Sequence, residues 1–184
     1  DYLGECQAVD RGIGILLEEL EAAGELANTL FVVSGDHGIP GMPRAKCNLY
    51  NIGCEAALAI RWPEKIEAGR VVDDFVNLMD LAPTFCEAGG IDVPKSMTAN
   101  SLMPILTSNQ SGQVEPDRDF VVTGRERHVH HAREGMLPYP QRAIRTADFI
   151  YIVNFEPDRW PMGDPKGLDS IDTPLPDYEA LAYD

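Results

Sequence analysis

An aspartate and a histidine stand side by side in a short segment flanked by glycines, residues 34–38 with the sequence Ser-Gly-Asp-His-Gly. The carboxylate of Asp36 and the imidazole of His37 could both bind one divalent cation, and the flanking glycines would let the backbone approach a ligand closely. Oxygen donors favour a hard cation such as Ca²⁺. In the simpler alternative, Asp36 caps a turn and His37 is a solvated loop residue. We therefore treat Asp36 and His37 as a candidate metal-binding pair.

A lysine follows this pair after a stretch rich in glycine and proline, residues 39–45. If Lys46 lies near a bound cation, its ammonium group could neutralise an anionic substrate and the negative charge that develops during a reaction. Tyr50 and Gly53 come shortly afterwards. Because a solvated surface lysine is the commoner case, Lys46 is a candidate only in combination with the pair before it.

A basic segment interrupts an otherwise acidic chain. The formal net charge is −15, which argues against nucleic acid as a partner. Residues 118–145 nevertheless hold six arginines against three acidic residues, a local balance of +3, together with three histidines. This concentration predicts a local anion site, in which Arg127, His128 and Arg142 could bind anionic groups. Alternatively, these residues brace a junction between subdomains through surface ion pairs, or charge simply fluctuates along the chain.

Alternating helical and extended patterns predict an α/β fold that would position these residues. Apolar residues recur at helical spacing over residues 1–24, and an apolar run follows at 30–33. Such a run suits a strand buried on both faces of a parallel sheet, and ligands bind at the carboxyl ends of such strands. The other predicted elements are a strand at 56–63, a helix within 71–85, a strand at 120–122 and a hairpin or strand pair over 142–153.

Two further classes of feature are not favoured by the sequence. There is no apolar run of about 18 residues, so no membrane span is expected. The four cysteines show no C-x-x-C spacing, which argues against a zinc or redox motif. Cys6 and Cys86 lie among apolar residues, and we expect both thiols to be buried.

The order of several motifs resembles the type I, formylglycine-dependent sulfatases of the alkaline-phosphatase-like superfamily. The segments that carry this resemblance are Tyr2 to Asp10, Asn28-Thr29, Ser34 to Gly38, Lys46 with Tyr50 and Gly53, Leu58 to Pro63, Asp80 to Thr84, and Gly89-Gly90-Ile91 with Pro94. The branch that looks most similar is the heparan N-sulfatase (sulfamidase)-like one. Its segments are Asp36 to Pro40, Asn48 to Tyr50 and Tyr139 to Thr146; residues 124–128 and 154–161 look like related bacterial enzymes.

The resemblance implies a fold and a division of the chain. Residues 1–112 would form the C-terminal portion of the catalytic α/β domain, in which helices flank a mixed sheet. Residues 113–184 would begin a smaller C-terminal subdomain that is incomplete in this chain. Family members that process glycans work in the periplasm, outside the cell or in the lysosome, so the same compartments are expected here by analogy.

The resemblance also implies a chemistry. Sulfatases use a formylglycine, made from Cys or Ser in a C/S-x-P-x-R motif, whose hydrated aldehyde attacks sulfur beside one divalent cation, usually Ca²⁺. Asp36 and His37 match ligands of that cation, and Lys46 matches the basic residue that binds the sulfate group and the leaving atom. The implied partner is a sulfated carbohydrate, which Arg127, His128 and Arg142 would contact while Tyr139 stacks nearby.

The sequence departs from the family pattern at several points. No Cys or Ser of this chain begins a C/S-x-P-x-R motif, and the paired Asp residues that open the family's domain are missing. Glu55 falls near where many members carry Arg. We therefore expect the chain to be a fragment whose nucleophile lies upstream, and we expect the fragment alone to be inactive.

Three hypotheses for function remain at this point. The first is hydrolysis of a sulfate ester or N-sulfate on a glycan. The second is a phosphatase or phosphodiesterase of the same superfamily, although a two-metal site would need more histidines near Asp36 than this sequence has. The third is a noncatalytic, glycan-binding relative.

Overall fold

The computed structural model describes residues 2–40, 42–127 and 133–159, and the contacts between residues divide the chain into two compact units. Unit 1 contains the residues up to Val33 and Leu58–Asp117; unit 2 contains Ser34–Ala57 and the residues from Arg118 onward. The sequence predicted one division after residue 112. The structural division near that point falls at Asp117, and the segment Ser34–Ala57 joins the second unit.

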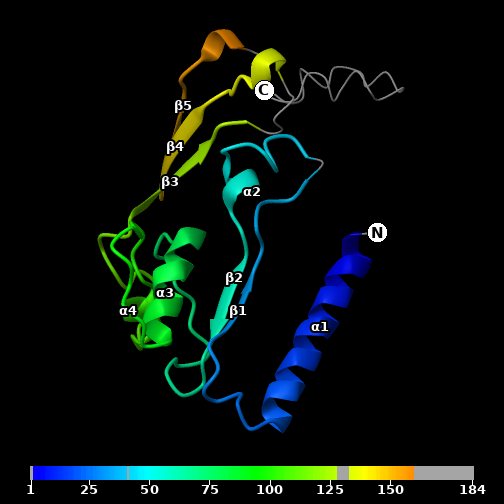
Figure 1. Cartoon of the computed structure of the whole chain (residues 1–184), viewed down its shortest axis with the longest axis vertical. Helices are drawn as coiled ribbons and strands as arrows, with labels where there is room; N and C mark the ends of the chain where they lie inside the picture. The colour runs from blue at the N-terminus through cyan, green and yellow to red at the C-terminus, as the bar shows by residue number, and fades with distance from the viewer. Residues whose placement is uncertain (1, 41, 128–132, 160–184) are drawn as a thin grey trace. The chain divides into compact units, whose positions relative to one another are not determined.

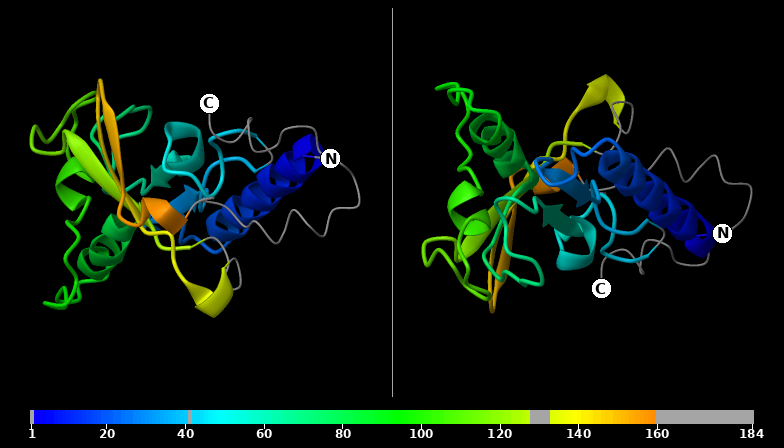
Figure 2. Two further views of the ribbon diagram at one scale, coloured as in Figure 1. Left: turned by 90° about the horizontal axis from the view of Figure 1, so that it is seen from above. Right: turned by 90° about the horizontal axis from the view of Figure 1, so that it is seen from below.

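Unit 1 begins with α1 (Tyr2–Ala22), a straight helix that is drawn in blue in Figure 1 and in both views of Figure 2. The helix ends where the sequence predicted, because Gly24 adopts a left-handed backbone conformation with φ +74°. The chain then enters β1 (Phe31–Ser34), which pairs with β2 (Leu58–Arg61) in a two-stranded sheet. The predicted helix–strand–strand order is therefore confirmed.

The structure does not confirm the predicted burial of these elements. Residues of β1 and β2 are half-buried or exposed, because a two-stranded sheet cannot cover both of its own faces. Helix α1 has no buried residue, and Cys6 on it is exposed. Cys86 is only partly buried, so the expectation of two buried thiols was wrong.

The remainder of unit 1 is a small helical cluster made of η1 (Leu78–Asp80), α3 (Leu81–Ala88) and α4 (Met103–Leu106). The helix predicted within residues 71–85 is confirmed: helical structure begins after Asn77, where Asn77 and Asp80 form a capping box, and α3 continues to Ala88. Leu102, Ile105 and Leu106 form the buried core of this cluster. Among the described residues, no helix is both long and apolar enough to cross a membrane.

Unit 2 combines one short helix, α2 (Asn51–Cys54), with an antiparallel sheet. Its strands are β3 (Phe120–Arg125), β4 (Gln141–Thr146) and β5 (Ile150–Asn154), in the order β3-β4-β5; short 3₁₀ turns lie at η2 (Glu134–Met136) and η3 (Pro157–Arg159). The predicted strand pair over 142–153 is confirmed as the β4–β5 hairpin. Strand β3 continues three residues beyond the predicted end at 122.

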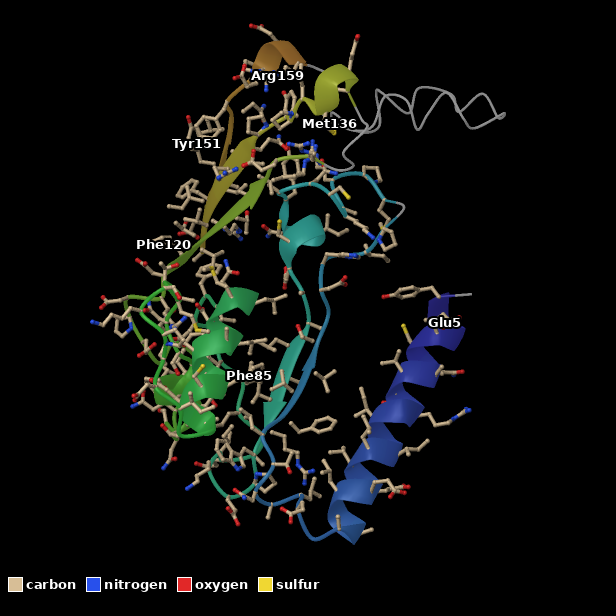
Figure 3. All side chains as sticks on the ribbon, in the orientation of Figure 1. Glu5, Phe85, Phe120, Met136, Tyr151 and Arg159 are labelled. Atoms are coloured by element: carbon tan, nitrogen blue, oxygen red, sulfur yellow. The ribbon has the colours of Figure 1, made fainter. Side chains whose placement is uncertain are left out.

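The two faces of this sheet differ in character. Ala143 and Gln141 are 2% and 4% exposed, and they define an inner face. On the outer face, Val122, Ile144 and Tyr151 are cross-strand neighbours and all are exposed. The side chains of Phe120 and Tyr151 extend from this outer face in Figure 3. The inner face is the side on which the segment before α2 packs, as its hydrogen bonds show below.

Candidate metal and anion site

Asp36 and His37 meet in the loop that follows β1. His37 Nε2 lies 3.3 Å from Asp36 Oδ2, while His37 Nδ1 lies 2.9 Å from the carbonyl oxygen of Gly38. Because a carbonyl oxygen can only accept, Nδ1 carries the hydrogen in this contact. The other ring nitrogen, Nε2, therefore faces the carboxylate either as a protonated donor or with its lone pair.

The donor set of this pair fits a divalent cation. With Nδ1–H held by a backbone carbonyl, Nε2 has the orientation that a second hydrogen bond imposes on metal-binding histidines. The 86% exposed carboxylate of Asp36 offers oxygen ligands on the same side of the ring. Within the described part of the chain, no group of three or more His, Cys, Asp or Glu residues gathers around a common point. Asp36 and His37 thus provide a partial ligand set.

Two glycines allow this loop to pack against α2. The amide of Gly38 donates to the carbonyl oxygen of Gly53 over 3.0 Å. A Cβ on Gly38 would collide with the carbonyl group of Ile52, and a Cβ on Gly53 would collide with the carbonyl oxygens of Ala45 and Asn48. Only glycine permits such close backbone approach, so both positions are needed to hold the Asp36–His37 segment where it is.

Lys46 lies in a tight turn of the same loop. Its amide donates to the carbonyl oxygen of Ile39 over 3.0 Å, and the amide of Asn48 donates to Ala45 over 3.0 Å. The side chain of Lys46 is exposed; Arg44 before the turn and Cys47 within it have φ values of +59° and +72°. Left-handed backbone at non-glycine residues costs about 1–3 kcal/mol and is found at functional sites.

The loop thus carries the predicted metal-binding pair, Asp36 and His37, together with the predicted sulfate-binding residue Lys46. Backbone hydrogen bonds connect its two arms, from Lys46 to Ile39 and from Gly38 to Gly53. Near its end the guanidinium group of Arg44 stacks over the ring of Tyr50 at 5.1 Å from the centroid.

Cys54, the last residue of α2, contacts both the loop and the sheet. Its thiol donates to the carbonyl oxygen of Asn48 over 3.3 Å. Burial raises the pKa of the Cys54 thiol, and a hydrogen bond with Thr123 of β3 opposes the shift. A thiol with a raised pKa stays protonated and acts as a hydrogen-bonding group rather than as a nucleophile.

The predicted anion-binding residues divide into separate environments. Arg142 pairs with Glu126 at 2.5 Å, and its side chain lies directly across Gly124, where a Cβ would be 2.9 Å from Arg142 Cδ. Arg127 is exposed, and His128 lies outside the described residues. Arg142 remains about half exposed beside its partner, so it can still contact an anion.

Tyr139 does not fit the prediction that it stacks against a sugar. The residue is 1% exposed, and the guanidinium carbon of Arg133 lies 5.2 Å from its ring centroid. Its backbone amide donates to the carbonyl oxygen of Glu126 over 2.7 Å. Burial makes Tyr139 a core residue of unit 2, because no face of the ring is open to a ligand.

Two arginines that the sequence did not single out extend from the inner face of the sheet, one to the Lys46 turn and one to α2. Arg125 of β3 donates a hydrogen bond to the carbonyl oxygen of Cys47, and Arg145 Nε of β4 donates to Asn51 Oδ1 over 2.9 Å. The signal that could have revealed them is strand alternation, which places Thr123, Arg125 and Arg145 on the same inner face.

The family comparison decides what kind of protein contains this loop. The C-terminal model of N-sulphoglucosamine sulphohydrolase matches residues 43–167. The chain belongs to the sulfatase family. Its α/β elements are accordingly part of the alkaline-phosphatase-like fold of these enzymes, as the motif order had predicted.

Individual sulfatases show the same relationship. The chain is 33% identical over 183 residues to the N-acetylglucosamine-6-O-sulfatase of Bacteroides thetaiotaomicron. This alignment covers 93% of the chain and 31% of the relative. The chain is 31% identical over 160 residues to human N-sulphoglucosamine sulphohydrolase, covering 80% of this chain and 30% of the relative. One solved structure, of a protein in complex with its substrate D-glucosamine-2-N,6-O-disulfate, matches with a TM-score of 0.66 and 29% identity, over 86% of this chain and 34% of that one.

The chain of this sulfatase family member spans about a third of the length of these relatives. The first two of these relatives are named as a sulfatase and a sulphohydrolase. The residues that the family model matches include Lys46 and the β3–β5 sheet, because the match runs from residue 43 to residue 167.

Proposed function

We propose that this chain forms the C-terminal part of the catalytic domain of an enzyme that hydrolyses sulfate esters or N-sulfates on glycans. The observation that supports the proposal most is the grouping of Asp36, His37 and Lys46 in one glycine-dependent loop within a sulfatase-family chain. A carboxylate, an imidazole nitrogen and an ammonium group are the groups that transfer of a sulfate group requires around its oxygens.

In this proposal Asp36 and His37 hold one divalent cation, expected to be Ca²⁺. When bound there, the cation would supply Lewis-acid stabilisation of negative charge on sulfate oxygens. The exposed carboxylate of Asp36 would bind it directly, and the Gly38 carbonyl would keep the ring of His37 in the tautomer that presents Nε2. The formylglycine nucleophile would come from the part of the protein that precedes this chain.

Lys46 would bind the sulfate group and assist departure of the leaving atom. Its ammonium charge would neutralise the nonbridging oxygens as negative charge spreads over them. The same group could donate a proton to the departing oxygen or nitrogen. The hydrogen bond from its backbone amide to Ile39 holds the base of this side chain to the arm that carries His37.

Arg142 and Arg127 remain candidates for binding the anionic groups of the sugar, together with His128. Arg142 would do so from its ion pair with Glu126, in which the carboxylate orients the guanidinium fork across Gly124. Tyr139 is left out of the substrate site because it is buried. The names of the relatives suggest sulfated glucosamine as the first sugar to test.

The experiment is a substrate panel tested on the full-length protein that contains this chain, produced together with a formylglycine-generating enzyme. Glucosamine N-sulfate, glucosamine 6-O-sulfate and p-nitrophenyl phosphate are supplied separately, and released sulfate or phosphate is measured by ion chromatography. We expect sulfate release with Ca²⁺ present. Phosphate release without sulfate release would support the phosphatase hypothesis, and sugar binding without turnover would support the noncatalytic one.

A further inference from the structure

We propose that Arg125 is a positioning residue for Lys46, acting through the backbone of the turn that carries the lysine. The guanidinium group of Arg125 donates a hydrogen bond to the carbonyl oxygen of Cys47, the residue directly after Lys46. The proposal rests on the proposed function, because it gives Lys46 a catalytic task. It adds a residue of the antiparallel sheet to the machinery of the site, at a position that does not itself touch the substrate.

The turn at Lys46 needs such an anchor because its backbone is strained. Cys47 has a φ of +72°, a conformation that a residue with a Cβ seldom adopts. Within the turn, the hydrogen bond from Asn48 to Ala45 spans the strained residue but leaves the Cys47 carbonyl group to be fixed from outside. A charge-assisted hydrogen bond from an arginine is stronger than a neutral one, so it can offset part of this strain.

The position of Arg125 in the sheet makes this contact rigid. Arg125 is the last residue of β3 and lies opposite Gln141 of β4, which is 4% exposed. The arginine is itself partly buried. A side chain that is packed between neighbours has already lost much of its rotamer freedom, so little further entropy is lost when it binds the Cys47 carbonyl group.

A second contact from the same strand supports the far side of the turn. Thr123 precedes Arg125 by two residues and therefore lies on the same face of β3. It is hydrogen-bonded with the Cys54 thiol, which donates to the carbonyl oxygen of Asn48. Adjacent inner positions of one strand thus hold the carbonyl groups of two consecutive residues, Cys47 and Asn48. This arrangement fixes the direction in which Lys46 leaves the backbone.

The expected consequence is a loss of turnover without a loss of substrate binding. A displacement of about 1 Å in a catalytic group can lower the rate by about 10²-fold. Without Arg125, Cys47 can relax toward negative φ and move the ammonium group of Lys46 away from the sulfate. The sugar contacts proposed for Arg127 and Arg142 come from other residues, so they are not removed by the change.

The test compares Arg125→Gln, Arg125→Lys and Arg145→Gln in the full-length protein, with sulfate release from the substrate found in the panel above. Arg145 is the matched control, because it is an inner-face arginine that contacts Asn51 of α2 instead of the Lys46 turn. For Arg125→Gln we expect kcat to fall by about 10–10²-fold with KM changed less than about twofold. Arg125→Lys, which keeps a charged donor, should recover part of kcat, and Arg145→Gln should retain most of it.

Hydrogen exchange provides a readout that is independent of turnover. The amides of Lys46 and Asn48 are both hydrogen-bonded, so they should exchange slowly in the parent and faster in Arg125→Gln, while Arg145→Gln leaves them unchanged. If Arg125→Gln does not fold, Thr123→Val should show the same exchange pattern to a smaller extent.

The results separate this inference from the proposed function. A parent enzyme without sulfatase activity would refute the proposed function, and unchanged exchange at Lys46 and Asn48 would refute the positioning role whatever the activity. An Arg125→Gln variant with normal kcat would also overturn the inference. So would a variant with raised KM and normal kcat, because that pattern would make Arg125 a direct substrate ligand.

Discussion

At the scale of single residues, two contacts orient the His37 ring. The Gly38 carbonyl fixes the hydrogen on Nδ1, which leaves Nε2 directed at the Asp36 carboxylate. A backbone carbonyl at one ring nitrogen and a carboxylate at the other restrict how the ring can turn. A bound cation would satisfy both Nε2 and the carboxylate at once.

We predict that Asp36→Asn abolishes most turnover of the full-length enzyme and weakens Ca²⁺ binding. The amide keeps the shape of the side chain but removes the negative charge that a hard cation requires. The control is Asp148→Asn, which also removes one negative charge but at an exposed position of unit 2. Calorimetric titration with Ca²⁺ after chelator treatment, and sulfate release, measure the two effects. Unchanged turnover in Asp36→Asn would exclude Asp36 as a ligand.

We predict that Lys46→Ala lowers kcat by about 10²-fold or more, as the loss of one charge-stabilising group does. Lys46→Arg keeps the positive charge and should lose less. Lys65→Ala, which removes an exposed lysine of unit 1, should have no effect on turnover. Steady-state kinetics with the same sulfated sugar compare the three variants. A loss in Lys46→Ala far below tenfold would place Lys46 outside the sulfate site.

The sequence singles out Asp36, His37 and Lys46 as candidates because they lie close together along the chain. Asp36 and His37 are neighbours, and Lys46 follows in the same loop, so motif order was enough to nominate all three. Arg125 and Tyr139 were different, because their roles depend on strand register and burial. The sequence of residues 124–127 does not show which of its two arginines turns inward; alternation in β3 turns Arg125 inward, while Arg127 lies beyond the strand. A tyrosine in a basic segment gives no indication in the sequence that it will be 1% exposed.

At the scale of elements, the segment from Ser34 to Ala57 works as one structural piece. Its start is tied to its end by the hydrogen bond from the Gly35 amide to the Ala57 carbonyl oxygen, 2.9 Å long, and its middle by the Gly38–Gly53 bond. Helix α2 has only four residues, too few to be stable by itself. It is held by close backbone contacts and by the inner face of β3 and β4, through Arg145 and Cys54.

We predict that Gly53→Ala destabilises this segment and reduces activity. The new Cβ would collide with two backbone carbonyl groups that cannot move without opening the Lys46 turn, and overpacking of this kind costs about 1–3 kcal/mol. Gly14→Ala is the matched control, since a Cβ there meets nothing within 4 Å and alanine favours the helix by about 0.5–1 kcal/mol. Denaturant unfolding and sulfate release compare the two. Parent-like activity in Gly53→Ala would show that the close approach is not needed.

The elements themselves were predicted well where a pattern was local. The α1 helix, its glycine stop and the β4–β5 hairpin follow from apolar spacing and turn residues within each segment. The helix predicted within residues 71–85 is also present, and the capping box of Asn77 and Asp80 sets the residue at which it begins. Burial of β1 and β2 was predicted for strands inside a parallel sheet, whereas within the described residues these two strands pair only with each other.

At the scale of the whole molecule, the contact units do not follow the order of the sequence. The loop with Asp36, His37 and Lys46 belongs with the antiparallel sheet of unit 2. In the sequence, however, this loop lies between β1 and β2, and nearly all residues of these two strands belong to unit 1. Sequence order suggested a catalytic domain followed by a subdomain. The contacts instead group the candidate site with the later part of the chain, which is why Arg125 and Thr123 of β3 can support the Lys46 turn.

This grouping predicts that stability and catalysis respond to different mutations. Ile105 is 3% exposed in the core of unit 1, and Ile105→Val should lower the free energy of unfolding by about 0.5–1.5 kcal/mol through the lost methylene group. None of the contacts that hold the Lys46 turn involves this core, so kcat per folded molecule should stay the same. Arg125→Gln should show the opposite balance, with a larger change in kcat than in stability. The comparison needs urea unfolding and kinetics on the same preparations of the full-length protein. If Ile105→Val lowers kcat well beyond its effect on the folded fraction, the two units are coupled, and the site cannot be assigned to unit 2 alone.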